Sequence, residues 1–172
     1  MPNDLAFDQN GNLLFTCPGN SLGNDTGYIC CLTPEKQLSK IFKGMDYPNG
    51  LPLNKAQSQL FVAETGTKKI WQFDWNTKTN QLSNKNLFTE TGGSICPDGI
   101  AFDEYGNLYV AVYGSGKVKV WDENGVLKEE IDALGNNPTN CALDPFGKKG
   151  LIITEAEKGL LVQLQTKKRG II

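Results

Sequence analysis

The stretch PDGIAFDEYGNLYVAVYGSGKVKVWD, residues 97–122, decides the fold class. Its segments are short, rich in branched and aromatic residues, and separated by turns that contain glycine, which accepts left-handed backbone conformations. Residues 117–122 alternate polar and apolar side chains, as expected for a strand with one face in water. With the residues that follow, the stretch predicts a four-stranded antiparallel sheet with strands at 99–103, 108–112, 117–122 and 126–131.

Three other parts of the chain repeat this pattern. The repeats begin with PND, PNG, PDG and PTNC, and their marker residues are Asn3, Asn49, Asp98 and Asn140, spaced by 46, 49 and 42 residues. In a β-rich chain, a period of roughly 40 to 50 residues is typical of four-stranded propeller blades. We therefore predict an all-β, propeller-type fold of four four-stranded blades in a single, partial propeller domain. The predicted blades cover about 1–46, 47–95, 96–137 and 138–172.

Some details of this assignment are less regular. The outer strand of the last blade is left open, because the chain ends in a short tail after GLLVQLQ. The polar stretch 76–85 is expected to be an exposed loop. The segments DQNGN at 8–12 and DEYGN at 103–107 superficially resemble calcium loops, but they lack the EF-hand spacing, so we expect hairpin turns. Glu64 and Glu155 each follow a second strand, and we expect them to make contacts at the blade edges, with a place at the channel mouth as the alternative.

The composition narrows the possible chemistry. The chain has 172 residues and a net charge of −2, without the basic patch of a nucleic-acid binder. No apolar run approaches the roughly 20 residues of a membrane span. Histidine is absent, which excludes Ser-His and Cys-His nucleophiles and the commonest zinc ligand. We therefore expect neither a nucleic-acid nor a membrane partner, and any catalysis must use other groups.

The five cysteines indicate a reducing compartment. They form no C-x-x-C pair, and an odd number does not suit a complete disulfide framework. We therefore expect free thiols and a cytoplasmic location, with a periplasmic or secreted one left open if an N-terminal segment is missing. The chain begins directly at the lead-in to an inner strand, so its open blade edges predict either a larger ring or self-association through those edges.

The marker residues offer a site for a hard cation. Equivalent inner-strand positions of a propeller converge on one axis, where Asn3, Asn49 and Asp98 would present two amide oxygens and one carboxylate. Such ligands suit Ca²⁺, with Mg²⁺ or Mn²⁺ as alternatives, and argue against copper or zinc. Asp98 alone among these three could take a proton from water. The alternative is structural, because Asn and Asp before glycine are ordinary turn residues.

In their order, PND, PNG, PDG and PTNC resemble the SMP-30/gluconolactonase/luciferin-regenerating family of six-bladed β-propellers over nearly the whole chain. The resemblance implies a lactonase that holds a divalent cation, often calcium. By this resemblance Asn49 and Asp98 match direct metal ligands, and Asp98 also matches the proposed general base. Asn3 matches a channel asparagine that contacts the metal site or the substrate.

The chain departs from the family pattern in two places. It lacks the EGP-type motif whose glutamate is the family's first metal ligand, because it corresponds to the family's last four blades. It also has Cys17 where gluconolactonase-type relatives often have aspartate. The sequence thus predicts metal-dependent hydrolysis of a small, sugar-type lactone. The alternatives are a non-catalytic binding propeller or inactive fragment, and two chains that pair edge to edge and share a site.

Overall fold

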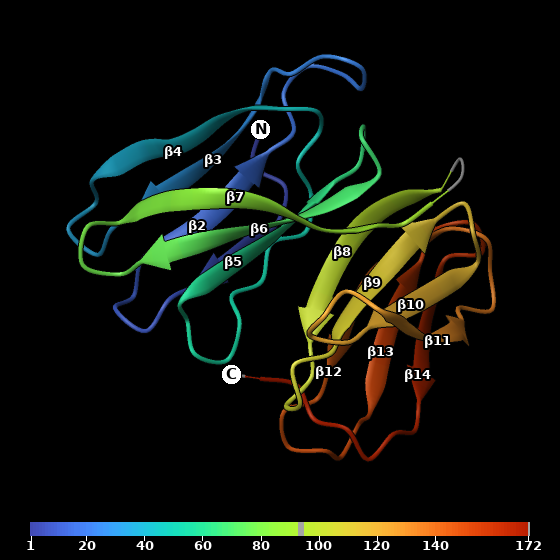
Figure 1. The fold of residues 1–172 in the computed structure, drawn as a ribbon. Coiled ribbons are helices and arrows are strands. Elements are labelled where there is room, and N and C mark those ends of the chain that lie inside the picture. Colours follow the sequence, from blue (N-terminus) through green and yellow to red (C-terminus); the bar gives the residue numbers. More distant parts are fainter. Residues whose placement is uncertain (93–94, 172) are drawn as a thin grey trace. The chain divides into compact units, whose positions relative to one another are not determined.

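The computed structural model describes residues 1–92 and 95–171. Within these ranges every helix or strand assigned is a β-strand, and the strands form four antiparallel sheets (Figure 1). We number the sheets 1 to 4 along the chain, and each lies within one of the four predicted blades. The prediction of an all-β fold is confirmed. The chain divides into two compact units, Met1–Glu90 and Thr91–Ile172, which are described separately below.

The first unit contains sheets 1 and 2. Sheet 1 has four strands in sequential order: β1 (Leu5–Phe7), β2 (Leu13–Cys17), β3 (Gly27–Leu32) and β4 (Leu38–Met45). Sheet 2 has three strands: β5 (Gln59–Glu64), β6 (Lys69–Asn76) and β7 (Gln81–Glu90). One face of each sheet contributes to a shared core that includes Leu14, Ile29, Leu60, Phe73 and Trp75. Trp75 therefore packs between sheet 1 and sheet 2.

The second unit contains sheets 3 and 4. Sheet 3 consists of β8 (Cys96–Phe102), β9 (Leu108–Tyr113), β10 (Lys117–Trp121) and β11 (Leu127–Asp132). Sheet 4 consists of β12 (Pro138–Leu143), β13 (Leu151–Glu155) and β14 (Leu160–Leu164). The core of this unit includes Tyr109, Val118, Cys141, Ile153 and Val162.

Two sheets have three strands where four were predicted. In sheet 2, the expected first strand is reduced to isolated bridges from Pro48 to Glu64 and from Leu53 to Leu60. Two prolines in this segment lack the N–H that a regular ladder needs. In sheet 4, the tail turns away from β14, and Arg169 O accepts the backbone N–H of Glu104 over 2.8 Å instead.

The expected loop at 76–85 is partly wrong. Strand β7 already begins at Gln81, which leaves only residues 77–80 between β6 and β7. Strand β7 is an outer strand whose side chains are largely exposed, so it can contain many polar residues. Because its first residues are only weakly hydrophobic, they were not predicted as part of a strand. The strand is also irregular, because its pairing with β6 shifts register and Asn84 has a positive φ of 50°.

The DQNGN and DEYGN segments are hairpin turns, as predicted. Asp8 Oδ1 accepts the backbone N–H groups of Asn10 and Asn12, each over 2.9 Å, and Gly11 takes a positive φ of 79°. Asp103 repeats the pattern toward residues two and four positions later. These carboxylates therefore serve the turns. The part of the chain that the structure describes also contains no helix of the length and hydrophobicity needed to cross a membrane.

Candidate functional site

The side chains of Asn3 and Asn49 meet in the first unit. Asn3 Nδ2 donates a hydrogen bond to Asn49 Oδ1 over 2.9 Å, although the residues are 46 positions apart. The backbone fixes both, because Asn3 N donates to Thr16 O over 2.9 Å and Asn49 N donates to Ala63 O over 2.7 Å. Strands β2 and β5 thus hold two lead-in amides side by side.

Two threonines orient the Asn49 amide. Asn49 is only 7% exposed, and its Nδ2 donates to Thr65 Oγ1 over 3.3 Å. The buried Thr16 hydroxyl donates to the backbone oxygen of Asn49 over 2.8 Å. With Nδ2 turned toward Thr65, Oδ1 faces Asn3. An amide oxygen has two lone pairs, so the bond from Asn3 leaves acceptor capacity for a further ligand.

Asp4 is a candidate that sequence reasoning missed. Its Oδ1 accepts the N–H of Leu5 over 2.9 Å, and its Oδ2 accepts the N–H of Leu51 over 3.3 Å. Burial raises the pKa of the Asp4 carboxyl, and these two N–H groups offset only part of that rise. A signal was present, because PNG and PDG have glycine at the position where PND has this acid.

Asp98 lies inside strand β8 rather than in front of it. Asp98 was expected to lie just before a strand at 99–103, but strand β8 already begins at Cys96. The pairing of β8 with β9 shifts register between Pro97 and Ile100, which marks a bulge around Asp98. Bulges re-aim side chains and are common beside functional sites. The half-buried Asp98 therefore occupies an irregular position of the strand.

The second unit brings its own two lead-ins together. A Cβ atom built on Gly99 would lie only 2.2 Å from Asn140 Oδ1, so the Asn140 side chain lies directly against the Gly99 backbone. Asn140 Oδ1 also accepts the N–H of Cys141 over 2.8 Å. Asn3, Asp4 and Asn49 thus belong to the first unit and Asp98 to the second, so a ligand set shared by both stays a prediction.

The sequence profile described as "SMP-30/Gluconolactonase/LRE-like region" matches residues 1–157. The chain belongs to this family. The expectation drawn from the repeated lead-ins is therefore confirmed.

Relatives within the SMP-30/gluconolactonase family are longer than this chain. Diisopropyl-fluorophosphatase of Loligo vulgaris is 31% identical over 98% of this chain and 58% of its own length. Gluconolactonase of Zymomonas mobilis is 27% identical over 98% of this chain and 51% of its own. The crystal structure of regucalcin from Agrobacterium tumefaciens, named a calcium-binding protein, has a TM-score of 0.88 and 19% identity, over 98% of this chain and 62% of its own. The chain thus spans about half to three-fifths of these relatives.

A divalent cation would suit the oxygen donors at the predicted positions. Asn3, Asn49, Asp4 and Asp98 offer amide and carboxylate oxygens, which hard cations such as Ca²⁺ prefer. No three His, Cys, Asp or Glu side chains converge anywhere in 1–92 or 95–171. A cation here would therefore depend on the amide oxygens of Asn3 and Asn49 as well as on carboxylates.

The buried Glu64 and Glu155 hold the connections between blades. Glu64 Oε1 accepts the N–H of Asp46 over 3.0 Å, and its Oε2 accepts the indole N–H of Trp71 over 2.7 Å. Glu155 Oε1 likewise accepts the N–H of Asn137 over 2.9 Å. Glu64 ends strand β5 and Glu155 ends strand β13, and each binds the segment that leads into its own blade. The predicted blade-edge role is confirmed.

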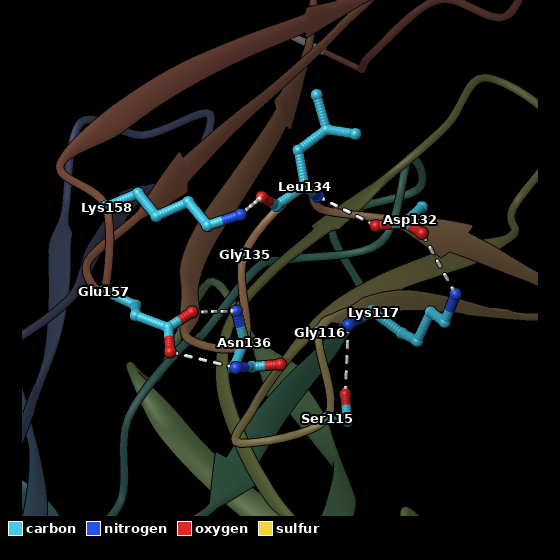
Figure 2. A pocket seen from close by; sticks show the side chains of 9 residues that line it. All are labelled: Ser115, Gly116, Lys117, Asp132, Leu134, Gly135, Asn136, Glu157 and Lys158. Atoms are coloured by element: carbon cyan, nitrogen blue, oxygen red, sulfur yellow. Dashed lines mark hydrogen bonds and ion pairs between the residues drawn. The ribbon is translucent and has the colours of Figure 1, made fainter.

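A shallow cavity of about 570 Å³ lies in the second unit (Figure 2). Glu157 Oε1 and Oε2 accept hydrogen bonds from the side chain and backbone of Asn136, over 2.9 and 2.8 Å. Lys158 Nζ donates to Leu134 O over 2.7 Å, and Lys117 pairs with Asp132 at 3.4 Å. Each charged side chain named here therefore binds another residue that lines the cavity, and Asp98 is not among its lining residues.

Proposed function

We propose that this chain carries the reacting groups of a divalent-cation-dependent hydrolase that opens a small, sugar-type lactone. Family membership supports the proposal, as do relatives named gluconolactonase and lactonase. The observation that carries it is the hydrogen bond between Asn3 and Asn49, because it joins amides from two repeats at the predicted ligand positions. The cation we expect is Ca²⁺, with Mg²⁺ or Mn²⁺ as alternatives, and the free cysteines fit a cytoplasmic location.

Each residue has a distinct proposed role. Asn49 and Asp98 would hold the cation, and Asn3 would hold the cation or orient the lactone. When bound, the cation supplies polarisation of the ester carbonyl and a lower pKa for water. Asp98 would accept a proton from the attacking water, which typically contributes ~10²- to 10⁴-fold in rate. As the ring C–O bond breaks, the leaving oxygen takes up a proton, so lactone and water become one hydroxy acid.

A matched pair of variants tests this proposal. Asp98→Asn removes the base and one charged ligand, whereas Asp122→Asn changes a half-buried turn carboxylate of the same unit. We expect calcium-dependent gluconolactone hydrolysis, followed by acid release in a pH-stat, to fall by about 10²-fold or more in Asp98→Asn and to be unchanged in Asp122→Asn. Calcium uptake measured by calorimetry should weaken only in Asp98→Asn. Equal activity and equal uptake in both variants would contradict the assignment.

A second candidate function is hydrolysis of a phosphorus–fluorine bond. It is favoured by the 31% identity to the enzyme named diisopropyl-fluorophosphatase, which spans 98% of this chain. The same water and base would serve, with fluoride as the leaving group. Fluoride release from diisopropyl fluorophosphate, measured beside lactone opening, decides between the two substrates. Calcium-independent folding with neither activity would instead support a non-catalytic binding propeller.

A further inference from the structure

The C-terminal tail, residues 165–171, connects two hairpin turns of the second unit. It leaves β14 and crosses toward the ends of β8 and β12 (Figure 1). Glu104, in the turn that joins β8 to β9, donates its N–H to Arg169 O over 2.8 Å and accepts the Arg169 N–H at its Oε1 over 3.2 Å. Gly170 N donates to the oxygen of Asp144, in the turn that joins β12 to β13, over 3.4 Å. The tail therefore links the ends of sheets 3 and 4.

The cations of this tail alternate between the sheets and the solvent. The Nζ of Lys168 lies 3.5 Å from Glu129 Oε2 and 5.6 Å from the centre of the Tyr109 ring, so this side chain points toward the sheets. Lys167 and Arg169, on either side of it in the sequence, are both exposed. One lysine thus fastens the tail, and two cations remain at the surface.

Each of the two turns has an exposed aromatic side chain at its tip. Tyr105 is 71% exposed and Phe146 is 70% exposed. The two residues occupy equivalent positions, because each donates its backbone N–H to the carboxylate of the aspartate two residues earlier, over 2.9 and 3.0 Å. These hydrogen bonds use only backbone N–H groups, so neither ring is needed to form its turn.

Four exposed cations lie in the same turn and tail. Lys148 and Lys149 follow Phe146 directly after Gly147. The Arg169 side chain lies against this turn, since a Cβ built on Gly147 would come within 3.2 Å of its Nε. No ion pair formed within residues 1–92 and 95–171 involves any of the four. We call the whole set the tail patch: Tyr105, Phe146, Lys148, Lys149, Lys167 and Arg169.

The carboxylates close to the tail patch are held by backbone groups. Asp144 Oδ2 accepts the N–H groups of Lys148 and Lys149, each over 2.7 Å, and Glu104 Oε1 accepts the N–H of Arg169. These two acids face four cations, so the patch keeps an excess of positive charge. The next acid along this end of sheet 3, Asp122, has its own cation at 3.7 Å.

Aromatic rings combined with exposed cations suit the surface of an anionic membrane. Aromatic side chains settle at the level of the lipid headgroups, and clusters of Lys and Arg are attracted to anionic lipids. A single-stranded nucleic acid is instead bound in a groove that follows its backbone. Both rings of the tail patch stand at the tips of turns, where a flat surface can reach them. Anionic lipids are found in the cytoplasmic leaflet, which agrees with the proposed location.

We propose that the tail patch docks the protein on the surface of a membrane that contains anionic phospholipids. Tyr105 and Phe146 would enter the headgroup layer, and the four cations would contact lipid phosphates. This inference goes beyond the proposed function and does not depend on it. It departs from the expectation of no membrane partner, which rested on composition. A net charge of −2 averages over the chain, whereas folding gathers these cations at one end of two sheets.

Vesicle flotation of the full 172-residue chain is the experiment. The probes are phosphatidylcholine vesicles with and without about 30% phosphatidylserine. The double variant Lys148→Gln/Lys149→Gln removes two charges from the patch. Its control, Lys117→Gln/Lys158→Gln, removes two charges at the opposite end of the same sheets, beside the turns after β9 and β13.

A second pair of variants tests the rings. Phe146→Ser removes an aromatic tip from the patch, and Tyr113→Ser removes an exposed ring at the far end of β9. Circular dichroism verifies that all four variants keep their sheets.

We expect binding to the phosphatidylserine vesicles that is lost between about 0.1 and 1 M NaCl, because salt screens exposed charges. The double lysine variant should weaken binding by roughly 10-fold or more, since each cation near an anionic surface contributes about fivefold. Phe146→Ser should weaken it by roughly threefold or more, because apolar burial adds to the electrostatic attraction. The two control variants should bind as the parent chain does.

Three results would overturn the proposal. One is the absence of binding to phosphatidylserine vesicles, and another is equal binding to both kinds of vesicle. The third is an equal effect of the patch variants and their controls. A single-stranded oligonucleotide that binds through the same lysines, and more tightly than the vesicles, would assign the patch to nucleic acid instead. Lactone hydrolysis is not a readout here, so either proposal can fail without the other.

Discussion

Asp4 and Leu51 are joined by a hydrogen bond between the lead-ins of sheets 1 and 2. Asp4 Oδ2 accepts the backbone N–H of Leu51 over 3.3 Å, one residue beyond Asn3 in the first lead-in and two residues beyond Asn49 in the second. Two successive contacts thus fasten these lead-ins together. They bring a carboxyl whose pKa is raised by burial next to two amide side chains.

The titration of Asp4 should set it apart from other aspartates. Its pKa is raised by burial, whereas the pKa of Asp144 is lowered chiefly by the N–H groups of Phe146 and Lys149. Carbon-detected NMR of the carboxyl groups should therefore place Asp4 above the ordinary aspartate value of about 3.9 and Asp144 below it. A raised folded-state pKa means that the contribution of Asp4 to stability is greatest in acid and is lost as the pH rises through that pKa. Identical titration curves would contradict this.

Removal of the Asn49 side chain should destabilise the first unit. Asn49→Ala removes the hydrogen bonds that the buried Asn49 side chain makes with Thr65 and Asn3, which typically costs about 1 to 3 kcal/mol. Urea unfolding is the measurement. Asn20→Ala serves as the control, because Asn20 lies exposed in a loop of the same unit. Equal losses in the two variants would show that the Asn49 network contributes nothing.

Glu155 should make the protein sensitive to acid. Burial acts to raise its pKa, but the N–H groups of Lys158, Glu157 and Asn137 outweigh it, so its pKa lies below the ordinary value. A lowered folded-state pKa gives stability above the unfolded pKa of about 4.3, and this stability is lost as the pH falls through the folded value.

Glu155→Gln should therefore lower the Tm at pH 7, and its difference from the parent should shrink below about pH 4. Thermal unfolding across this pH range is the measurement, with the exposed Glu123→Gln as control. A Tm difference that stays constant with pH would mean that the charge of Glu155 is irrelevant.

Gly99 should tolerate no side chain while Asn140 is present. Gly99→Ala places a Cβ 2.2 Å from Asn140 Oδ1, and we expect a loss of roughly 1 to 3 kcal/mol, as overpacking typically causes. The double variant with Asn140→Ala should recover part of it, because the Asn140 backbone also lies close. Additive losses in this double-mutant cycle would contradict the contact.

Much of the fold could be predicted from residues that are close together in the sequence. Alternation in KVKVW and turn residues such as Asp103 and Gly106 depend on neighbours a few positions away, so the hairpins of sheet 3 were predictable. The first residues of strand β7 were predicted as a loop, because its exposed side chains show no clear alternation of polar and apolar residues. The reduced first strand of sheet 2 was also missed, since its prolines remove ladder hydrogen bonds without changing the apolar pattern.

For the candidate site too, some residues could be predicted from the sequence and some contacts could not. Recurrence of Asn3, Asn49 and Asp98 at equal places in a repeat was enough to single them out, since a repeated fold gives equivalent residues equivalent positions. Tertiary structure alone revealed the bond of Asp4 to Leu51 and the contact of Asn140 with Gly99. Periodicity tells which residues share a face, but whether a face is covered depends on contacts between residues distant in sequence, and no local pattern encodes those.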